Sequence, residues 1–223
     1  MGPVTPMPQP ERVAIIGAGV IGAAWAARWM LCGSDALVYD PGPETERIVS
    51  EVAENARHSW ERMGLASARE GSLTITQSIE EAADEVALVQ ESVPEDAILK
   101  KQVLKQIEQA APKSALIASS TSGLLPSELQ EDMKYPERFL VGHPFNPVYL
   151  LPMVEVVAGK KTSPSSVSSA MHLYQTVGMK PLEVRVEIDA FIADRLLEAV
   201  WREALWLVND GVATTAEIDD VIR

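Results

Sequence analysis

The chain has 223 residues, which at about 150 residues per domain predicts one full domain and part of a second. Hydrophobic residues make up 47% and charged residues 23%, so the composition excludes a disordered tail, a collagen-like fibre and a disulfide scaffold. The formal net charge of −13 argues against binding to nucleic acids or anionic membrane surfaces, because both repel an acidic protein. No apolar run approaches the roughly 18 to 20 residues that a membrane-spanning helix needs.

The first residues and the single cysteine predict a cytoplasmic protein. Residues 1–10 contain four prolines and no apolar core, so we expect a flexible lead rather than a secretory signal. Cys32 lies in an apolar helical stretch, which indicates a buried structural thiol. A lone cysteine cannot form an internal disulfide, and this fits a reducing compartment.

Short β-branched runs alternate with longer amphipathic segments over residues 11–188. This alternation predicts an α/β fold: a Rossmann-type domain whose mainly parallel sheet is covered by helices on both faces. The later runs are joined by shorter segments, so we expect the sheet to continue with smaller connections. The candidate strands are 12–16, 36–39, 73–75, 86–90, 115–118, 139–142, 153–157 and 180–184, and the candidate helices are 20–31, 45–63 and 95–110.

The pattern changes at residue 189, where helices alone are predicted. Apolar residues recur at spacings of three and four from Phe191 to Val208, which is typical of a helix with one apolar face. Thr214 and Thr215 can cap a second helix. Two helices cannot bury such a face by themselves. We therefore expect residues 189–223 to be the beginning of an all-α C-terminal domain that is cut short, with more chain or a partner subunit covering this face.

A glycine-rich segment follows the first candidate strand and opens the first candidate helix. Gly17 allows the tight turn, Gly19 leaves room for a pyrophosphate, and Gly22 permits close packing of helix on strand. Asp40 ends the second strand, where a carboxylate accepts hydrogen bonds from ribose hydroxyls and repels a 2′-phosphate. The pattern predicts a site for NAD rather than NADP. The alternative is that the glycines only make a turn in an α/β fold without a cofactor.

Polar residues that suit alcohol oxidation follow the later strands. His143 can take a hydroxyl proton, and Glu155 can orient its imidazole and stabilise the imidazolium. A serine hydroxyl from 119–123 and the amide of Asn146 can hold the substrate oxygen. From spacing alone, a structural loop histidine and a surface acid fit better, because one histidine and one acid seldom specify chemistry. No metal site is expected.

Several motifs together resemble the 3-hydroxyacyl-CoA dehydrogenase family. They are Gly17–Gly22, Glu95 with Lys100, Ser119–Gly123, His143–Pro147 and Val154–Val157. The resemblance implies a catalytic His143–Glu155 pair, with Ser122 and Asn146 near the substrate hydroxyl and nicotinamide. It also implies that Glu95 and Lys100 contact NAD, and that the helical C-terminal domain forms a homodimer.

Two departures from that family's usual pattern bear on the substrate. Asp194 stands where the acyl-CoA enzymes have an asparagine, and 44–63 lacks the lysine expected to meet CoA phosphates. Phe145–Pro152 and Ala190–Ala199 resemble instead the branch of the family that oxidises L-carnitine. Carnitine carries a quaternary ammonium, which aromatic faces and carboxylates bind. The resemblance therefore implies Asp194, with Phe145 and Tyr149, at the substrate, while Trp201 and Trp206 fit simple helix packing better.

Three readings of the function stay open beside carnitine oxidation. The substrate can be another 3-hydroxy acid, such as a sugar acid of the L-gulonate type, or a 3-hydroxyacyl-CoA. A third reading, from a different class, is a non-catalytic, crystallin-like structural protein that keeps the NAD-binding fold. Against this last reading stands the intact set of Ser122, His143, Asn146 and Glu155, which packing alone does not require.

Overall fold

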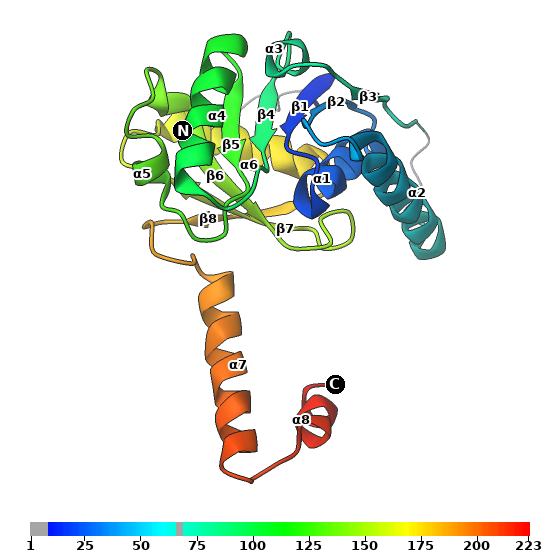
Figure 1. The fold of residues 1–223 in the computed structure, drawn as a ribbon, viewed down its shortest axis with the longest axis vertical. Coiled ribbons are helices and arrows are strands. Elements are labelled where there is room, and N and C mark those ends of the chain that lie inside the picture. Colours follow the sequence, from blue (N-terminus) through cyan, green and yellow to red (C-terminus); the bar gives the residue numbers. More distant parts are fainter. Residues whose placement is uncertain (1–8, 66–68) are drawn as a thin grey trace, which may run out of the picture.

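The computed structural model describes residues 9–65 and 69–223, which form one eight-stranded sheet flanked by helices and then two further helices (Figure 1). The predicted α/β class with a mainly parallel sheet is confirmed. The strands are β1 (Arg12–Ile16), β2 (Asp35–Tyr39), β3 (Leu73–Ile75), β4 (Leu88–Glu91), β5 (Leu116–Ser119), β6 (Phe139–Pro144), β7 (Met153–Ala158) and β8 (Lys180–Val184). The helices are α1 (Val20–Leu31), α2 (Thr45–Met63), α3 (Ile79–Ala82), α4 (Ala97–Ala110), α5 (Pro126–Leu129), the 3₁₀ turn η1 (Pro136–Arg138), α6 (Pro164–Thr176), α7 (Ala193–Asn209) and α8 (Thr215–Ile222).

The direction in which the sheet is wound switches at its centre. The strand order is β3-β2-β1-β4-β5-β6-β7-β8, so the chain builds outward to one side from β1 and to the other side from β4. Neighbouring strands are parallel except for β6 and β7, which form an antiparallel pair. In open sheets of this kind, ligands bind in the crevice outside the carboxyl ends of the strands at the switch point.

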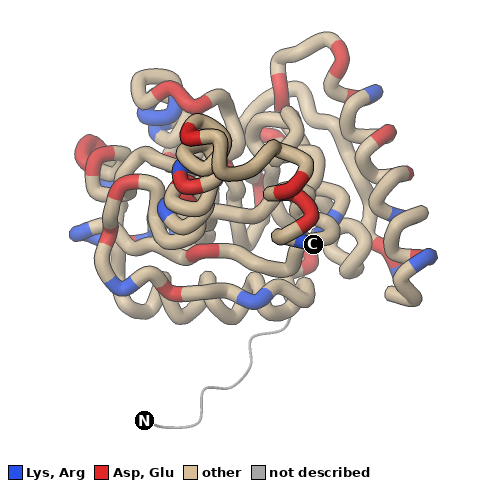
Figure 2. The backbone as a smooth tube through the Cα atoms, turned by 90° about the horizontal axis from the view of Figure 1, so that it is seen from below, with Lys and Arg blue, Asp and Glu red and all other residues tan. Residues whose placement is uncertain are grey.

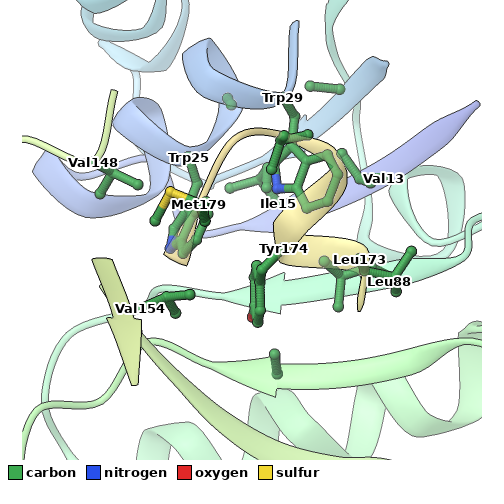
Figure 3. Packing of buried hydrophobic residues seen from close by; sticks show 14 of the residues in the cluster. Val13, Ile15, Trp25, Trp29, Leu88, Val148, Val154, Leu173, Tyr174 and Met179 are labelled. Atoms are coloured by element: carbon green, nitrogen blue, oxygen red, sulfur yellow. The ribbon is translucent and has the colours of Figure 1, made fainter. Parts of the chain in front are cut away.

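Helices cover both faces of the sheet through two apolar layers. α1, α2 and α6 pack on one face, and α3, α4 and α5 pack on the other. Alternate residues of β1 point to the two layers, Val13 and Ile15 to the first and Ala14 and Ile16 to the second. Figure 3 shows the first layer, in which the tryptophans of α1 and Tyr174 of α6 lie against the strands.

Helix α6 corrects the expectation that the later strands have only small connections. It is 13 residues long and joins β7 to β8. Its four serines have weak helix propensity and obscure the apolar spacing of Val167, Ala170 and Tyr174, which are buried on the sheet. Ser163 caps the helix and Pro164 occupies its first turn, a start signal that the sequence does contain.

The helical region differs from the sheet domain in having no buried face. α7 runs away from the sheet and α8 follows at its far end (Figure 1). Neither helix has a buried residue among those described. α7 begins at Ala193 rather than at Phe191, because Ala190 and Phe191 have φ values of 58° and 47°. Phe191 is instead buried against β6, β7 and β8.

The expected flexible lead falls largely on residues 1–8, outside the described residues, while Gln9 donates hydrogen bonds to the Cys32 carbonyl and to Ser34 Oγ. Cys32 itself is half-buried.

Acidic residues are spread over many elements rather than gathered in one patch (Figure 2). Within the described chain, no helix combines the length and apolarity needed to cross a membrane.

Candidate active site

The turn from β1 into α1 opens onto a cavity at the switch point. Gly17 has a φ of +94°, and a Cβ there would lie 2.7 Å from the Ser92 backbone. A Cβ on Gly22 would lie 1.8 Å from the Gly17 carbonyl oxygen, whereas nothing lies within 4 Å of the Cβ position of Gly19. No side chain caps α1 at Gly19. The first amides of α1 therefore face open space and can bind a phosphate anion.

Asp40 is fixed at the rim of this cavity by two backbone amides. Its Oδ2 accepts a hydrogen bond of 2.7 Å from the amide of Ala18, and its Oδ1 accepts one of 2.7 Å from Gly42. Each carboxylate oxygen has a second lone pair, so both can still accept a ribose hydroxyl. The geometry fits the predicted contact with the adenosine ribose.

A buried ion pair ties β4 to α4 behind the cavity. Nζ of Lys100 lies 2.8 Å from Glu91 Oε1, 3.0 Å from the Val93 carbonyl and 3.4 Å from Glu95 Oε2. Ser119 donates a 2.5 Å hydrogen bond to the other oxygen of Glu91. Burial raises the pKa of Glu91, and the charge of Lys100 opposes that rise. Lys100 lines the cavity but is only 1% exposed, so it acts on the cavity mainly through the groups that it holds.

Glu95 orders the serine-rich loop that follows β5. Its Oε1 accepts hydrogen bonds from the amides of Ser122 at 3.1 Å and Gly123 at 3.2 Å, and also from the hydroxyl of Thr121. Glu95 itself is exposed and lines the cavity, as does Ser122. The predicted cofactor residues therefore lie together around one crevice.

His143 and Glu155 are partners in the antiparallel register of β6 and β7. Directly paired residues project to the same face, and Nδ1 of His143 lies 2.9 Å from Glu155 Oε2. A slip of one residue in this register would send Glu155 to the opposite face of the sheet. The pairing explains why a histidine and an acid that are 12 residues apart form a buried contact.

The second oxygen of Glu155 caps α7. Oε1 accepts hydrogen bonds from the amides of Ile192 at 3.0 Å and Ala193 at 3.1 Å, and no side chain of the helix itself provides a cap. Burial works to raise the pKa of Glu155, but the hydrogen bonds from His143 and these two amides outweigh it and lower the pKa. Glu155 is therefore a carboxylate at neutral pH, and it joins the imidazole to the first turn of the helical region.

The imidazole lines a cavity of about 750 Å³. Its Nε2 lies 3.9 Å from Oδ2 of Asp194, which projects from the first turn of α7. The rings of Phe145 and Phe191 lie 6.0 Å and 5.5 Å from the imidazole, centre to centre. Asn146 also lines the cavity. The structure thus brings His143, Glu155, Ser122, Asn146, Phe145 and Asp194 to one place.

Tyr149 is the predicted site residue that the structure does not bring to this cavity. It packs against apolar residues of α1 and α2, and its carbonyl accepts a 2.6 Å hydrogen bond from Trp60 Nε1. Trp201 and Trp206 are 60% and 56% exposed on α7. Sequence reasoning missed Phe191 and Glu91. The signal for Glu91 was present, because an acid at the end of an apolar strand needs a buried partner.

Two family models match consecutive parts of the chain. The model of the 3-hydroxyacyl-CoA dehydrogenase NAD-binding domain matches residues 12–188, and the model of the C-terminal domain of that family matches residues 191–223. The observed crevice fits NAD independently of these matches, because Gly19 leaves the first amides of α1 open and Asp40 stands at the rim. Asp40, Glu95 and the first residues of α1 all line this crevice.

Individual curated proteins are also similar to this chain. An L-carnitine dehydrogenase of Mesorhizobium japonicum is 51% identical over 217 residues, which are 96% of this chain and 59% of that protein. An L-carnitine dehydrogenase/betainyl-CoA thioesterase of Rhizobium meliloti is 52% identical over 213 residues, 95% of this chain and 43% of that protein. The chain thus spans about half the length of these relatives.

A solved structure also superposes closely. It is that of 5-formyl-3-hydroxy-2-methylpyridine 4-carboxylic acid 5-dehydrogenase, an NAD+-dependent dismutase, with a TM-score of 0.89 and 33% identity. The match covers 95% of this chain and 69% of that one.

Proposed function

We propose that this chain, which belongs to the 3-hydroxyacyl-CoA dehydrogenase family, forms the cofactor site and catalytic pair of an NAD-dependent dehydrogenase that oxidises L-carnitine to 3-dehydrocarnitine. The observation that carries this proposal is the buried His143–Glu155 pair, whose second imidazole nitrogen faces the cavity beside Asp194. The names of relatives that are about half identical to the chain support the choice of substrate.

The proton half of the reaction follows from the hydrogen bonds of His143. Because Glu155 accepts the Nδ1–H, the neutral imidazole has no proton on Nε2, which can take the proton of the C3 hydroxyl. The carboxylate then stabilises the imidazolium. Ser122 and Asn146 hold the substrate oxygen from the cavity wall. NAD, when bound, supplies the acceptor for the hydride that leaves C3.

Asp194 suits the cation of carnitine. The quaternary nitrogen is attached to C4, next to the carbon that is oxidised, so it must lie close to the base when the hydroxyl contacts His143. A carboxylate 3.9 Å from Nε2 is in that region, and the ring of Phe145 lies on the same cavity. Carboxylates and aromatic faces both attract a quaternary ammonium that cannot donate hydrogen bonds.

The surface of α2 is less suited to CoA. The guanidinium of Arg47 is held by Glu44 at 2.7 Å and by Glu51 at 2.9 Å, and that of Arg57 by Glu70 at 2.8 Å. These arginines are thus engaged with acids on or near their own helix. Such pairing offsets the charge of two of the three arginines of α2, which also carries four glutamates, and this supports a small substrate over an acyl-CoA thioester.

We also propose a homodimer formed through the helical region. The large apolar side chains of α7 are exposed. In a symmetric dimer, the same face of a second copy would cover them. Sedimentation equilibrium tests this, and a monomer mass at every concentration would contradict it. A cytoplasmic location stays a prediction from the lone cysteine.

The substrate is tested by initial rates of NADH formation with L-carnitine, D-carnitine, L-gulonate and 3-hydroxybutyryl-CoA. We expect turnover of L-carnitine alone, and a rate with the thioester that exceeds it would contradict the proposal.

Asp194→Asn, the isosteric neutral variant, should raise the KM for L-carnitine and leave NADH binding unchanged. His143→Gln should lose roughly 10²- to 10⁴-fold in kcat while still binding NADH.

A further inference from the structure

A buried glutamine connects the strand of His143 to the cavity wall. Gln90 lies in β4, where it pairs with Ile15 of β1 on one side and Ala118 of β5 on the other. Its exposed fraction is 0%, so its side-chain amide has no access to water. A buried amide at the centre of a sheet must find its hydrogen-bond partners inside the protein.

The partners of Gln90 come from α6, from the loop after β5 and from β6. Its Oε1 accepts a 2.7 Å hydrogen bond from the hydroxyl of Tyr174, and its Nε2 donates to Ser120 Oγ at 2.8 Å and to the Gly142 carbonyl at 3.3 Å. A carbonyl can only accept, so the amide nitrogen must face Gly142. That requirement fixes the orientation of the amide and leaves Oε1 for Tyr174.

Tyr174 supports this amide from α6. Burial raises the pKa of its hydroxyl, which therefore stays protonated and donates to Gln90. The phenol ring stacks on Trp25 with centres 5.3 Å apart (Figure 3). A Cβ on Gly142 would lie 2.0 Å from the Tyr174 hydroxyl, so only glycine fits there. The residue before His143 is thus enclosed by Tyr174 and bonded to Gln90.

The other branch of the network reaches the cavity surface. Ser120 Oγ lies 2.8 Å from Ser92 Oγ, and both residues line the same cavity as His143. Since Ser120 already accepts a hydrogen from Gln90, its own hydrogen is directed to Ser92 or into the cavity. The register between β5 and β6 ends at Ser119 and Val141, so Gln90 bridges the two strands just beyond that ladder.

We propose that Gln90, held by Tyr174, is a positioning residue for the dehydrogenase reaction. Its amide fixes the positions of the Gly142 carbonyl and the Ser120 hydroxyl through hydrogen bonds. It thereby holds His143 in place relative to the cavity wall. Glu155 orients the imidazole ring, whereas Gln90 sets the backbone from which the ring projects. The role in catalysis rests on the proposed function, but the effect on the geometry of His143 does not.

The test compares Gln90→Met with Gln130→Met in the whole protein. Gln130 is a matched control, because it is 1% exposed and also makes three side-chain hydrogen bonds, to Pro136, Lys161 and Thr162, outside the cavity lining. Both variants should lower the melting temperature. Only Gln90→Met should lower kcat, by roughly 10- to 100-fold, with NADH affinity unchanged, because small misplacements of a reacting group cost that much. Equal kcat in the two variants would overturn the proposal.

A second comparison decides whether Tyr174 acts through Gln90. Tyr174→Phe removes one oxygen and should lower kcat in the same direction, and it carries the test if Gln90→Met does not fold. The double variant should lose no more kcat than the larger single loss, since one network is being broken twice. Independent, additive losses would contradict the link between the two residues.

A substrate-free readout separates this inference from the proposed function. The ¹⁵N resonances of the His143 imidazole should move in Gln90→Met and stay in place in Gln130→Met. If the parent protein oxidises no 3-hydroxy acid but these resonances move, the proposed function fails and the positioning of His143 by Gln90 stands. Unmoved resonances in Gln90→Met would overturn the positioning role whatever the substrate.

Discussion

Helices α1 and α7 both carry two tryptophans and several apolar neighbours, but they meet opposite environments. Trp25 and Trp29 of α1 are 0% exposed, whereas Trp201 and Trp206 of α7 are 60% and 56% exposed. An apolar spacing therefore predicts that a helix forms, not what covers it. The sheet domain buries its own helices, and the helical region leaves its face open. The candidate active site lies where the two regions meet, with Glu155 from the sheet and Asp194 from α7.

The largest expected effect comes from breaking the contact between the regions. Glu155→Gln keeps the shape of the side chain but removes its charge, and we expect kcat to fall roughly 10²- to 10⁴-fold because the imidazole loses its orienting carboxylate. Glu187→Gln is the matched control, since Glu187 lies in the linker before α7 and accepts hydrogen bonds from Ser127 of α5 without touching His143. Steady-state kinetics that show equal losses in both variants would contradict a specific role of Glu155.

Tryptophan substitutions measure the difference in burial directly. Trp29→Ala should lower the free energy of unfolding by roughly 3 to 5 kcal/mol, as for other large side chains removed from a core. Trp201→Ala should change that of the sheet domain by less than about 0.5 kcal/mol, since exposed positions contribute little. Urea titrations check both values. Because the proposed homodimer would cover the α7 face, the cost at Trp201 should rise above this value as protein concentration increases, and a cost that stays small at every concentration would contradict the dimer.

Acid should weaken the contacts of Glu155 with His143 and with the first turn of α7. Glu155 has a folded-state pKa below its ordinary value of 4.5, so its carboxylate stabilises the fold above that pH and the contribution is lost as the pH falls through the folded pKa. Glutamine does not titrate. The difference in unfolding free energy between the parent and Glu155→Gln should therefore shrink as the pH is lowered from 7 toward 3. A difference that stays constant over this range would be incompatible with the lowered pKa.

The smallest effect concerns the backbone just before α7. Ala190 has a φ of 58°, which an alanine adopts at a cost that glycine does not incur. Ala190→Gly should therefore stabilise the chain by about 0.5 to 1 kcal/mol. Ala193→Gly, three residues later in the first turn of α7, should destabilise it by a similar amount. Thermal unfolding that shows the same sign for both variants would argue against strain at Ala190.

Most of the fold was predictable because local pattern and tertiary burial agree. The glycine turn, the β-branched runs and the long amphipathic helices all lie close to the predicted bounds. The prediction failed where the two signals diverge. The serines of α6 hide a buried face, and Phe191 continues an apolar helical spacing although its positive φ turns it into the core of the sheet domain.

The candidate site was predictable residue by residue but not as a connected structure. His143, Glu155 and Asp194 were identified from motifs and resemblance, whereas the capping of α7 by Glu155 depends on a distant segment that no local pattern indicates. The sequence predicted Gln90 only as the last residue of an apolar strand. Its role was not predictable, because its hydrogen-bond partners Ser120 and Tyr174 are distant in the sequence. Tyr149 lies in a recognised motif, yet it packs against α1 and α2.

The two oxygens of Glu155 link the orientation of the imidazole to the position of α7. One oxygen contacts the imidazole and the other the first amides of α7, so the orientation of the base and the seating of that helix share a coupling free energy. By reciprocity, a ligand that favours the paired orientation of the imidazole also favours the seated helix, and the reverse. Substitutions along α7 that never touch the substrate can therefore change how the imidazole is held.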